Sequence, residues 1–176
     1  MNFVNAYQTL EFRNNNNIVE LYGPFKCERD IAWLGKGYYF WDTNIQLAKE
    51  WGNNAYIKSR YIIGKCRLDL STCFDLFGNI EHQLEFKEVI NLVKSHNLFK
   101  EEQIIVPNLI EYMKLKGVFN YKSIRAKDEK IQNEDNKVYF TCNKKEYLTL
   151  GNRVQICVID KRGVIKSKFK IVFSSN

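Results

Sequence analysis

The chain has few histidines, and its cysteines follow no metal-binding pattern. The two histidines, His82 and His96, fall in or at the edge of one predicted helix, where a surface position is more typical than a catalytic base. No Cys/His spacing suits the four ligands of a zinc site, so we expect no metal. The G-x-S-x-G turn of many hydrolases and the G-x-x-x-x-G-K-[ST] phosphate loop are both missing, which argues against these two enzyme classes.

Long apolar runs and paired cysteines are also missing. No run approaches the ~18 apolar residues that a membrane-spanning helix needs. No charged-then-apolar signal segment stands at the N-terminus, and the five cysteines are scattered without a C-x-x-C pair. We therefore expect a cytoplasmic protein with reduced thiols and no membrane partner.

Apolar and aromatic residues are plentiful. In 176 residues, 45% are hydrophobic and 14% aromatic, which predicts a packed core in one domain, residues 1–176. The local patterns predict an α+β fold, while residues 1–12 give no clear signal. Strands are expected at 18–21, 55–70 (as one strand or two), 123–126, 154–158 and 165–173, and helices at 43–52, 80–96 and 107–117.

The stretch from Trp33 to Gly52 combines two glycines, four consecutive aromatics and an amphipathic helix. Thr43 and Gln46 have the spacing of a capping box, and Gly52 is a typical helix stop. Glycine allows a backbone to approach a ligand closely, and aromatics just after it can form a slot for a flat ring. The same pattern is typical of a glycine-kinked edge strand that leads into a core helix, so both interpretations stay open.

A family resemblance favours the ligand slot. Gly35-Lys36-Gly37-Tyr38-Tyr39-Phe40, followed by a helix with Ala48 and Trp51, resembles the nicotinamide-binding segment of the ADP-ribosyltransferase superfamily. The branch of diphtheria toxin and the poly(ADP-ribose) polymerases is the most similar. The resemblance implies a split β-sandwich with flanking helices and NAD in the cleft between its two sheets. It also implies that Tyr39 stacks on nicotinamide and that Trp51 covers the other side of the ring, within a binding segment that includes Gly35, Gly37 and Tyr38.

Two positions of the family's His-Tyr-Glu signature differ in this chain. Tyr22-Gly23 matches the His-Gly that grips NAD, and Gln155 matches the glutamate that binds the ribose 2′-hydroxyl. Gln155 accepts a hydrogen bond but brings no negative charge, so the resemblance implies transfer of a single ADP-ribose rather than polymer synthesis. Compensation by Glu146, Glu28 or Arg125 stays open. Gln155 is equally typical of an ordinary polar residue on a half-buried strand.

The net charge of +7 favours anionic partners. Lysines and arginines gather in two groups: Lys58, Arg60, Lys65 and Arg67, and then Lys161, Arg162, Lys166, Lys168 and Lys170. We predict a nucleic acid acceptor, RNA before DNA. Small basic members of the superfamily resemble toxins of toxin–antitoxin or phage-defence modules, which implies an antitoxin partner. A protein acceptor, a protein that binds NAD or ADP-ribose without transfer, and a plain RNA-binding module stay open.

Overall fold

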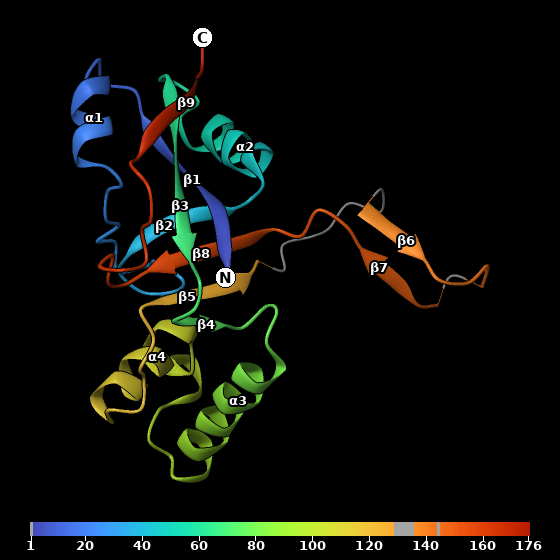
Figure 1. Ribbon diagram of the computed structural model, residues 1–176. Coiled ribbons are helices and arrows are strands. Elements are labelled where there is room, and N and C mark those ends of the chain that lie inside the picture. The colour runs from blue at the N-terminus through green and yellow to red at the C-terminus, as the bar shows by residue number, and fades with distance from the viewer. Residues whose placement is uncertain (1, 129–135, 144) are drawn as a thin grey trace.

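The computed structural model describes residues 2–128, 136–143 and 145–176, and its main element is one mixed sheet (Figure 1). Within these residues seven strands follow the order β4-β5-β8-β2-β1-β3-β9, and four α-helices lie around them, so the predicted α+β class is confirmed. Strands β4 and β5 run parallel, and the other neighbours are antiparallel. The strands are β1 (Phe3–Glu11), β2 (Tyr38–Asp42), β3 (Tyr61–Asp69), β4 (Cys73–Asp75), β5 (Ser123–Lys127), β8 (Val154–Val158) and β9 (Lys170–Ser174), and the helices are α1 (Asn16–Tyr22), α2 (Ile45–Ala55), α3 (Ile80–Ser95) and α4 (Val106–Leu115).

The N-terminal part of the chain differs most from the sequence prediction. Strand β1, which was not predicted because residues 1–12 show no clear pattern, pairs with β3 along its whole length. The strand predicted over 18–21 is wrong, because these residues belong to helix α1. The run is too short for its periodicity to separate a strand from two helical turns. Val19 is the buried residue of this helix, whereas Tyr22 at its end is 64% exposed.

The central stretch forms β2 and α2, close to the prediction, but both helix-end signals are wrong. Asn44 caps the helix in place of Thr43, since the Asn44 Oδ1 accepts the N–H of Gln46 at 2.9 Å. The helix also continues beyond Gly52. A Cβ at Gly52 would lie 2.5 Å from the ring of Tyr61, so this glycine provides space for a ring rather than a stop.

Helices α3 and α4 confirm the predictions from apolar periodicity, and strands β5 and β8 agree with theirs. Phe86 and Val93 of α3 are buried, as is Met113 of α4. Gly117 follows α4 with φ +69°, the left-handed conformation expected of a glycine C-cap. Figure 1 shows both helices together at one end of the molecule, beyond β4 and β5.

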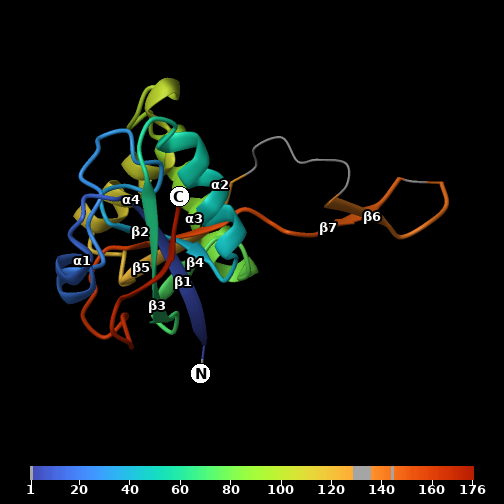
Figure 2. The same ribbon diagram turned by 90° about the horizontal axis from the view of Figure 1, so that it is seen from above.

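Two predicted strands are shorter in the structure. Of residues 55–70, predicted as one strand or two, only Tyr61–Asp69 form a strand, β3, and the strand predicted over 165–173 begins only at Lys170, as β9. A small hairpin, β6 (Lys137–Tyr139) with β7 (Tyr147–Thr149), was not predicted. It projects away from the body of the molecule (Figures 1 and 2). Residues 127–136 are rich in charged side chains, which favours a loop, but most of this segment lies outside the described residues.

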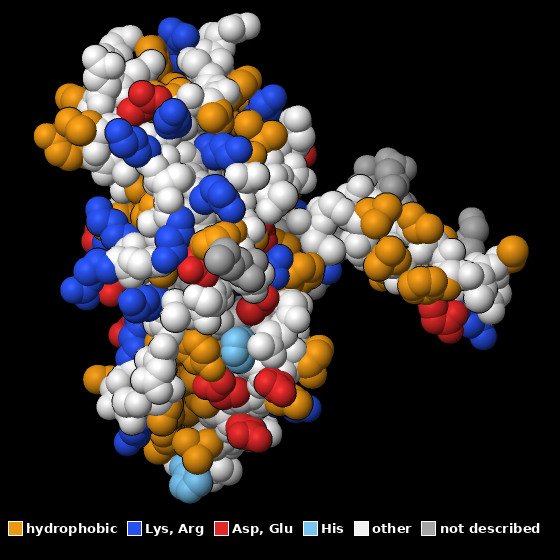
Figure 3. Space-filling model, in the orientation of Figure 1, with side chains coloured by type: hydrophobic (Ala, Val, Ile, Leu, Met, Phe, Trp, Pro, Cys, Tyr) orange, Lys and Arg blue, Asp and Glu red, His pale blue; other side chains and the backbone are white. Residues whose placement is uncertain are grey.

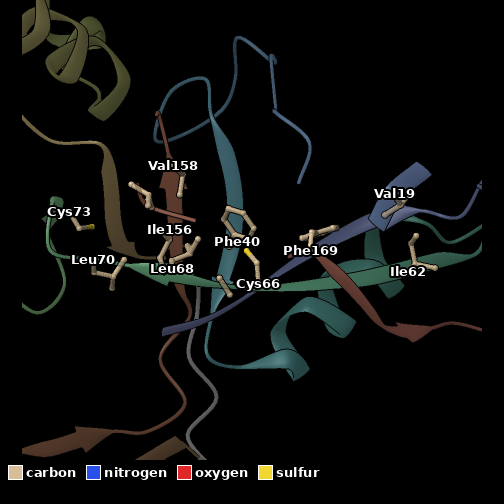
Figure 4. Close-up of a cluster of buried hydrophobic side chains, with 12 residues drawn as sticks. Val19, Phe40, Ile62, Cys66, Leu68, Leu70, Cys73, Ile156, Val158 and Phe169 are labelled. Carbon is tan, nitrogen blue, oxygen red and sulfur yellow. The ribbon is translucent and has the colours of Figure 1, made fainter. Parts of the chain in front are cut away.

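One face of the sheet carries a continuous apolar cluster. Phe40, Ile156 and Val158 point to this face and pack with Val19 of α1 and with Phe169, which precedes β9 (Figure 4). A Cβ at Gly64 would lie 2.0 Å from the Phe169 ring, so the sheet approaches this ring through a glycine. The cluster fixes α1 and the C-terminal segment on the first face.

The second face carries two separate clusters. Tyr7 and Trp41 are opposite each other in the β1–β2 register and pack under α2. Farther along the sheet, Phe74, Ile124 and Cys157 are in register with one another and pack under α3 and α4. Because the Trp41–Gln155 and Tyr39–Cys157 pairs link these clusters through β2 and β8, both helical covers lie on the same face.

Candidate functional site

A cavity of about 810 Å³ lies beside α2, next to the point where β1 and β2 separate. All three tryptophans of the chain line it, Trp33 from the connection before β2, Trp41 from β2 and Trp51 from α2. Its volume is in the range of ~300–1,000 Å³ that is typical of small-molecule and cofactor sites. The other lining residues are Tyr7, Gln8, Thr9, Leu10, Phe25, Lys26, Cys27, Glu28, Arg29, Ile31, Tyr39, Phe40, Asp128, Arg153 and Gln155.

Beside the cavity, strands β1 and β2 separate. They pair at Ala6–Asp42 and Tyr7–Trp41, and then the side chain of Gln8 replaces the backbone ladder. The Gln8 Nε2 donates to the carbonyl oxygens of Phe25 at 2.8 Å and Tyr39 at 3.3 Å, and its Oε1 accepts the Phe25 N–H at 2.8 Å. Gln8 is only 6% exposed, so these bonds satisfy a buried amide. One side chain therefore holds the connection before β2 against both strands.

Tyr39 is held by the glycine turn that precedes it. Its hydroxyl accepts the Leu34 N–H at 2.9 Å and donates to the Gly35 carbonyl at 2.8 Å. Burial, with a smaller contribution from neighbouring Cys157, raises the pKa of Tyr39 above its ordinary value, so the hydroxyl keeps its proton. Gly35 has φ +86°, and a Cβ at Gly37 would lie 2.5 Å from the Cys157 Sγ, so both glycines are needed to place the Tyr39 ring in the cavity wall.

Gln155 is oriented by a residue far away in the chain. The Trp33 Nε1 donates to the Gln155 Oε1 at 3.1 Å. Because an indole N–H only donates, this bond assigns the amide oxygen to Trp33 and leaves the amide NH2 group on the other side. That NH2 group has no hydrogen-bond partner among the described residues. Gln155 therefore offers the cavity a donor.

Charged groups border another part of the cavity wall. The Arg153 guanidinium lies 5.1 Å from the centre of the Trp41 ring and forms ion pairs with Glu50 at 3.3 Å and Asp128 at 3.6 Å. On the connection before β2, Lys26 pairs with Glu28 at 2.8 Å, and exposed Arg29 also lines the cavity. The site thus combines flat apolar walls with fixed charges at its border.

The structure brings some of the predicted site residues together and separates others. Tyr39, Trp51 and Gln155 line the same cavity, although they come from β2, α2 and β8. Within the described residues, the rings of Tyr39 and Trp51 make no contact with each other. The remaining predicted residues do not line the cavity; these are Tyr22, Gly23, Gly35, Gly37 and Tyr38.

Of the three residues that could compensate for the missing glutamate, one lies at the cavity. Glu28 lines it, paired with Lys26. Glu146 belongs to the turn of the projecting hairpin (Figure 1). Arg125 is held between Asp42 at 2.7 Å and Asp75 at 3.0 Å, away from the cavity wall.

The residues that sequence reasoning missed are Tyr7, Gln8, Trp33, Trp41 and Arg153. The apolar and β-branched residues of 3–10 carried a weak strand signal that could have placed Tyr7 beside the site. Nothing local marks Gln8 or Trp33, because their partners lie far away in the chain.

No family model, no curated protein and no solved structure matches this chain. Among the described residues, no group of three or more His, Cys, Asp or Glu side chains could hold a metal ion. No helix in the described part of the chain is both long and apolar enough to cross a membrane.

Proposed function

We propose that this protein is an NAD-dependent mono-ADP-ribosyltransferase that modifies nucleic acid, RNA before DNA, and acts as an intracellular toxin of a toxin–antitoxin or phage-defence system. The observation that carries the proposal is the meeting of Tyr39, Trp51 and Gln155 in one cavity. The family resemblance selected Tyr39 and Trp51 from one motif and Gln155 from its position on a late strand, and the three residues lie on three different elements.

The separation of β1 from β2 supports the split-sandwich fold in this proposal. The order β4-β5-β8-β2 would form one sheet and β1-β3-β9 the other, with only two cross-strand pairs between them. Because Tyr7 and Gln8 of β1 line the cavity and Tyr22 and Gly23 do not, Tyr7 and Gln8 would take the role that the resemblance gave to Tyr22 and Gly23.

The cavity residues fit NAD as the substrate. Nicotinamide would lie between Tyr39 and Trp51, since aromatic stacking adds about 0.5–1.5 kcal/mol beyond the burial of area. Lys26 and Arg29 would provide positive charge for the diphosphate. In the reaction, the bond between nicotinamide and ribose breaks, nicotinamide leaves with the electron pair, and the acceptor forms the new bond and loses a proton.

Gln155 would act as a donor in this site, which changes the role expected from the sequence. Its oxygen is already bonded to Trp33, so its NH2 group would donate to a ribose hydroxyl oxygen. A neutral bond is about half as strong as one to a carboxylate. The loss of the order of 1–2 kcal/mol corresponds to about tenfold or more in rate, which favours single transfer over polymer synthesis.

The test is release of nicotinamide from NAD by the purified protein, followed by labelled NAD with total RNA and total protein. We expect release, and label in the RNA fraction. Trp51→Ala should abolish release, while the matched variant Tyr56→Ala, which removes the ring that meets Trp51 edge-on outside the cavity lining, should retain it. Label in the protein fraction alone would mean that the acceptor is a protein and not RNA. A folded protein that releases no nicotinamide would overturn the transferase proposal.

A protein that binds NAD or ADP-ribose without transfer is the second candidate. The neutral, donor-oriented Gln155 favours it, because the site then lacks a negative charge at this position. Calorimetric binding of NAD by a protein that releases no nicotinamide would identify this case.

A further inference from the structure

Two basic segments that are 100 residues apart in the chain meet at the β9 edge of the sheet. Lys65 of β3 lies directly opposite Lys170 of β9. The Arg67 N–H donates to the Ser167 Oγ at 2.9 Å, and the Arg67 carbonyl accepts the Lys166 N–H at 2.9 Å. The two basic groups of the sequence therefore contribute to one surface.

This surface is electrostatically unfavourable to the folded protein by itself. Like charges directly opposite each other on neighbouring strands are destabilising. Within the described residues, no carboxylate pairs with Lys65, Arg67, Lys168 or Lys170, which we name the basic strip. Two carboxylates lie nearby but are engaged: Asp69 pairs with Lys166 at 3.4 Å, and Glu20 accepts the backbone N–H of Ile171 at 2.9 Å. An anionic ligand would relieve the uncompensated charge.

Aromatic rings support two of these cations. The Arg67 guanidinium lies 4.9 Å from the centre of the Phe3 ring, and the Lys65 ammonium lies 5.9 Å from the centre of the Tyr7 ring. Arg67 is exposed, so solvent reaches its guanidinium. Exposed guanidinium planes are stacking platforms for unpaired nucleic acid bases. This feature favours single-stranded nucleic acid over an acidic protein surface, which needs charge but no platform.

The basic strip begins at the wall of the cavity. Tyr7, whose ring lies under Lys65, lines the cavity, and Arg67 follows two residues farther along the same face of β3. Figure 3 shows Lys and Arg side chains over the part of the molecule that holds β3 and β9 in Figure 1, while several Asp and Glu side chains gather over the end that holds α3. A strand bound along the strip would therefore reach the cavity.

We propose that the basic strip binds single-stranded RNA and leads it to the cavity. The acceptor role rests on the proposed function, whereas binding of RNA does not. Phosphate contacts weaken with salt, with a slope of roughly −0.7 per contact in a plot of log affinity against log salt for single strands. Four contacts give a slope of about −3.

The experiment measures fluorescence anisotropy of a labelled, unstructured RNA oligonucleotide without NAD, over a series of salt concentrations. In Lys65→Gln/Lys170→Gln we expect a slope that is flatter by about 1.4 and an affinity about 25-fold weaker at ~0.1 M salt. The control Lys87→Gln/Lys116→Gln removes the same charge from exposed positions on α3 and just after α4, and it should bind as the unmodified protein does.

Equal losses of RNA affinity in the two double variants would overturn the proposal that the basic strip binds RNA, because the binding would then depend on net charge alone. Binding to vesicles that contain an anionic phospholipid, with none to RNA, would also overturn it. Nicotinamide release without RNA separates the two proposals. Release of nicotinamide without RNA binding would support the transferase proposal and overturn the proposal that the basic strip binds RNA. RNA binding without release would support the basic strip and overturn the transferase.

Discussion

Two regions on the same face of the sheet use aromatic residues in opposite ways. Under α3 and α4, the Phe74 ring contacts Phe86, Phe119 and Tyr121, with centroid separations of 4.8–5.8 Å. Beside α2, three tryptophans line a cavity, and two of them have polar or charged partners, Gln155 for Trp33 and Arg153 for Trp41, while Trp51 meets the Tyr56 ring edge-on. Abundant aromatics therefore do not by themselves predict a site, because the same ring types fill the core in one region and line a cavity in the other.

The largest expected effect is on the packed region. Phe74→Ala should lower the free energy of unfolding by about 3–5 kcal/mol, because Phe74 is fully buried and the ring leaves a cavity behind. Urea unfolding followed by circular dichroism measures this. Trp51→Ala, at a half-buried position, should cost clearly less. Equal losses of unfolding free energy in Phe74→Ala and Trp51→Ala would contradict the distinction between a packed region and a cavity.

The next effect concerns activity at the cavity. Trp51→Ala should abolish nicotinamide release, because both stacking and orientation of the ring are lost. Tyr39→Phe keeps the ring but removes the hydroxyl bonds to the turn, so it should retain more activity than Tyr39→Ala. Unchanged turnover in a folded Tyr39→Ala protein would contradict the assignment of the slot.

Gln155 gives a test of the donor role. Gln155→Ala should lower transfer by about tenfold. Gln155→Glu retains an acceptor for Trp33 but replaces the NH2 donor with a carboxylate oxygen, which accepts from a ribose hydroxyl, so we expect it to be tolerated or to raise NAD hydrolysis. Both are measured as kcat/KM for nicotinamide release. A fully active Gln155→Ala would assign the role to another residue.

Trp33→Phe should have the smallest effect. It removes one hydrogen bond, which is worth about 0.5–1.5 kcal/mol, and so we expect a two- to tenfold loss in kcat/KM. In a Gln155→Leu background the same change should have little further effect, because the two residues act as one unit. Additive losses would mean that Trp33 acts on the substrate directly.

The sequence predicted those parts of the molecule in which local pattern and tertiary packing agree. The 3.6-residue periodicity of α3 and α4 and the apolar run of β8 were sufficient. The α1 segment failed because four apolar-rich residues fit either a strand or a helix. Of the candidate site, the residues of one continuous motif, Tyr39 and Trp51, were found together with Gln155. The Trp33–Gln155 bond joins residues 122 positions apart, and no local signal carries such a contact.

The hydrogen bonds between the Gln8 side chain and the Phe25 backbone make the dynamics of the site measurable. The Phe25 amide proton is donated to a side chain rather than to a neighbouring strand. Its exchange with deuterated solvent therefore measures how often the connection before β2 opens, separately from global unfolding. Amide protons of β1 and β3 should exchange much more slowly, since they lie in a continuous ladder. A ligand that fills the cavity would slow the exchange of the Phe25 amide proton before that of other protons. The exchange rate of this one proton therefore reports whether the cavity is occupied.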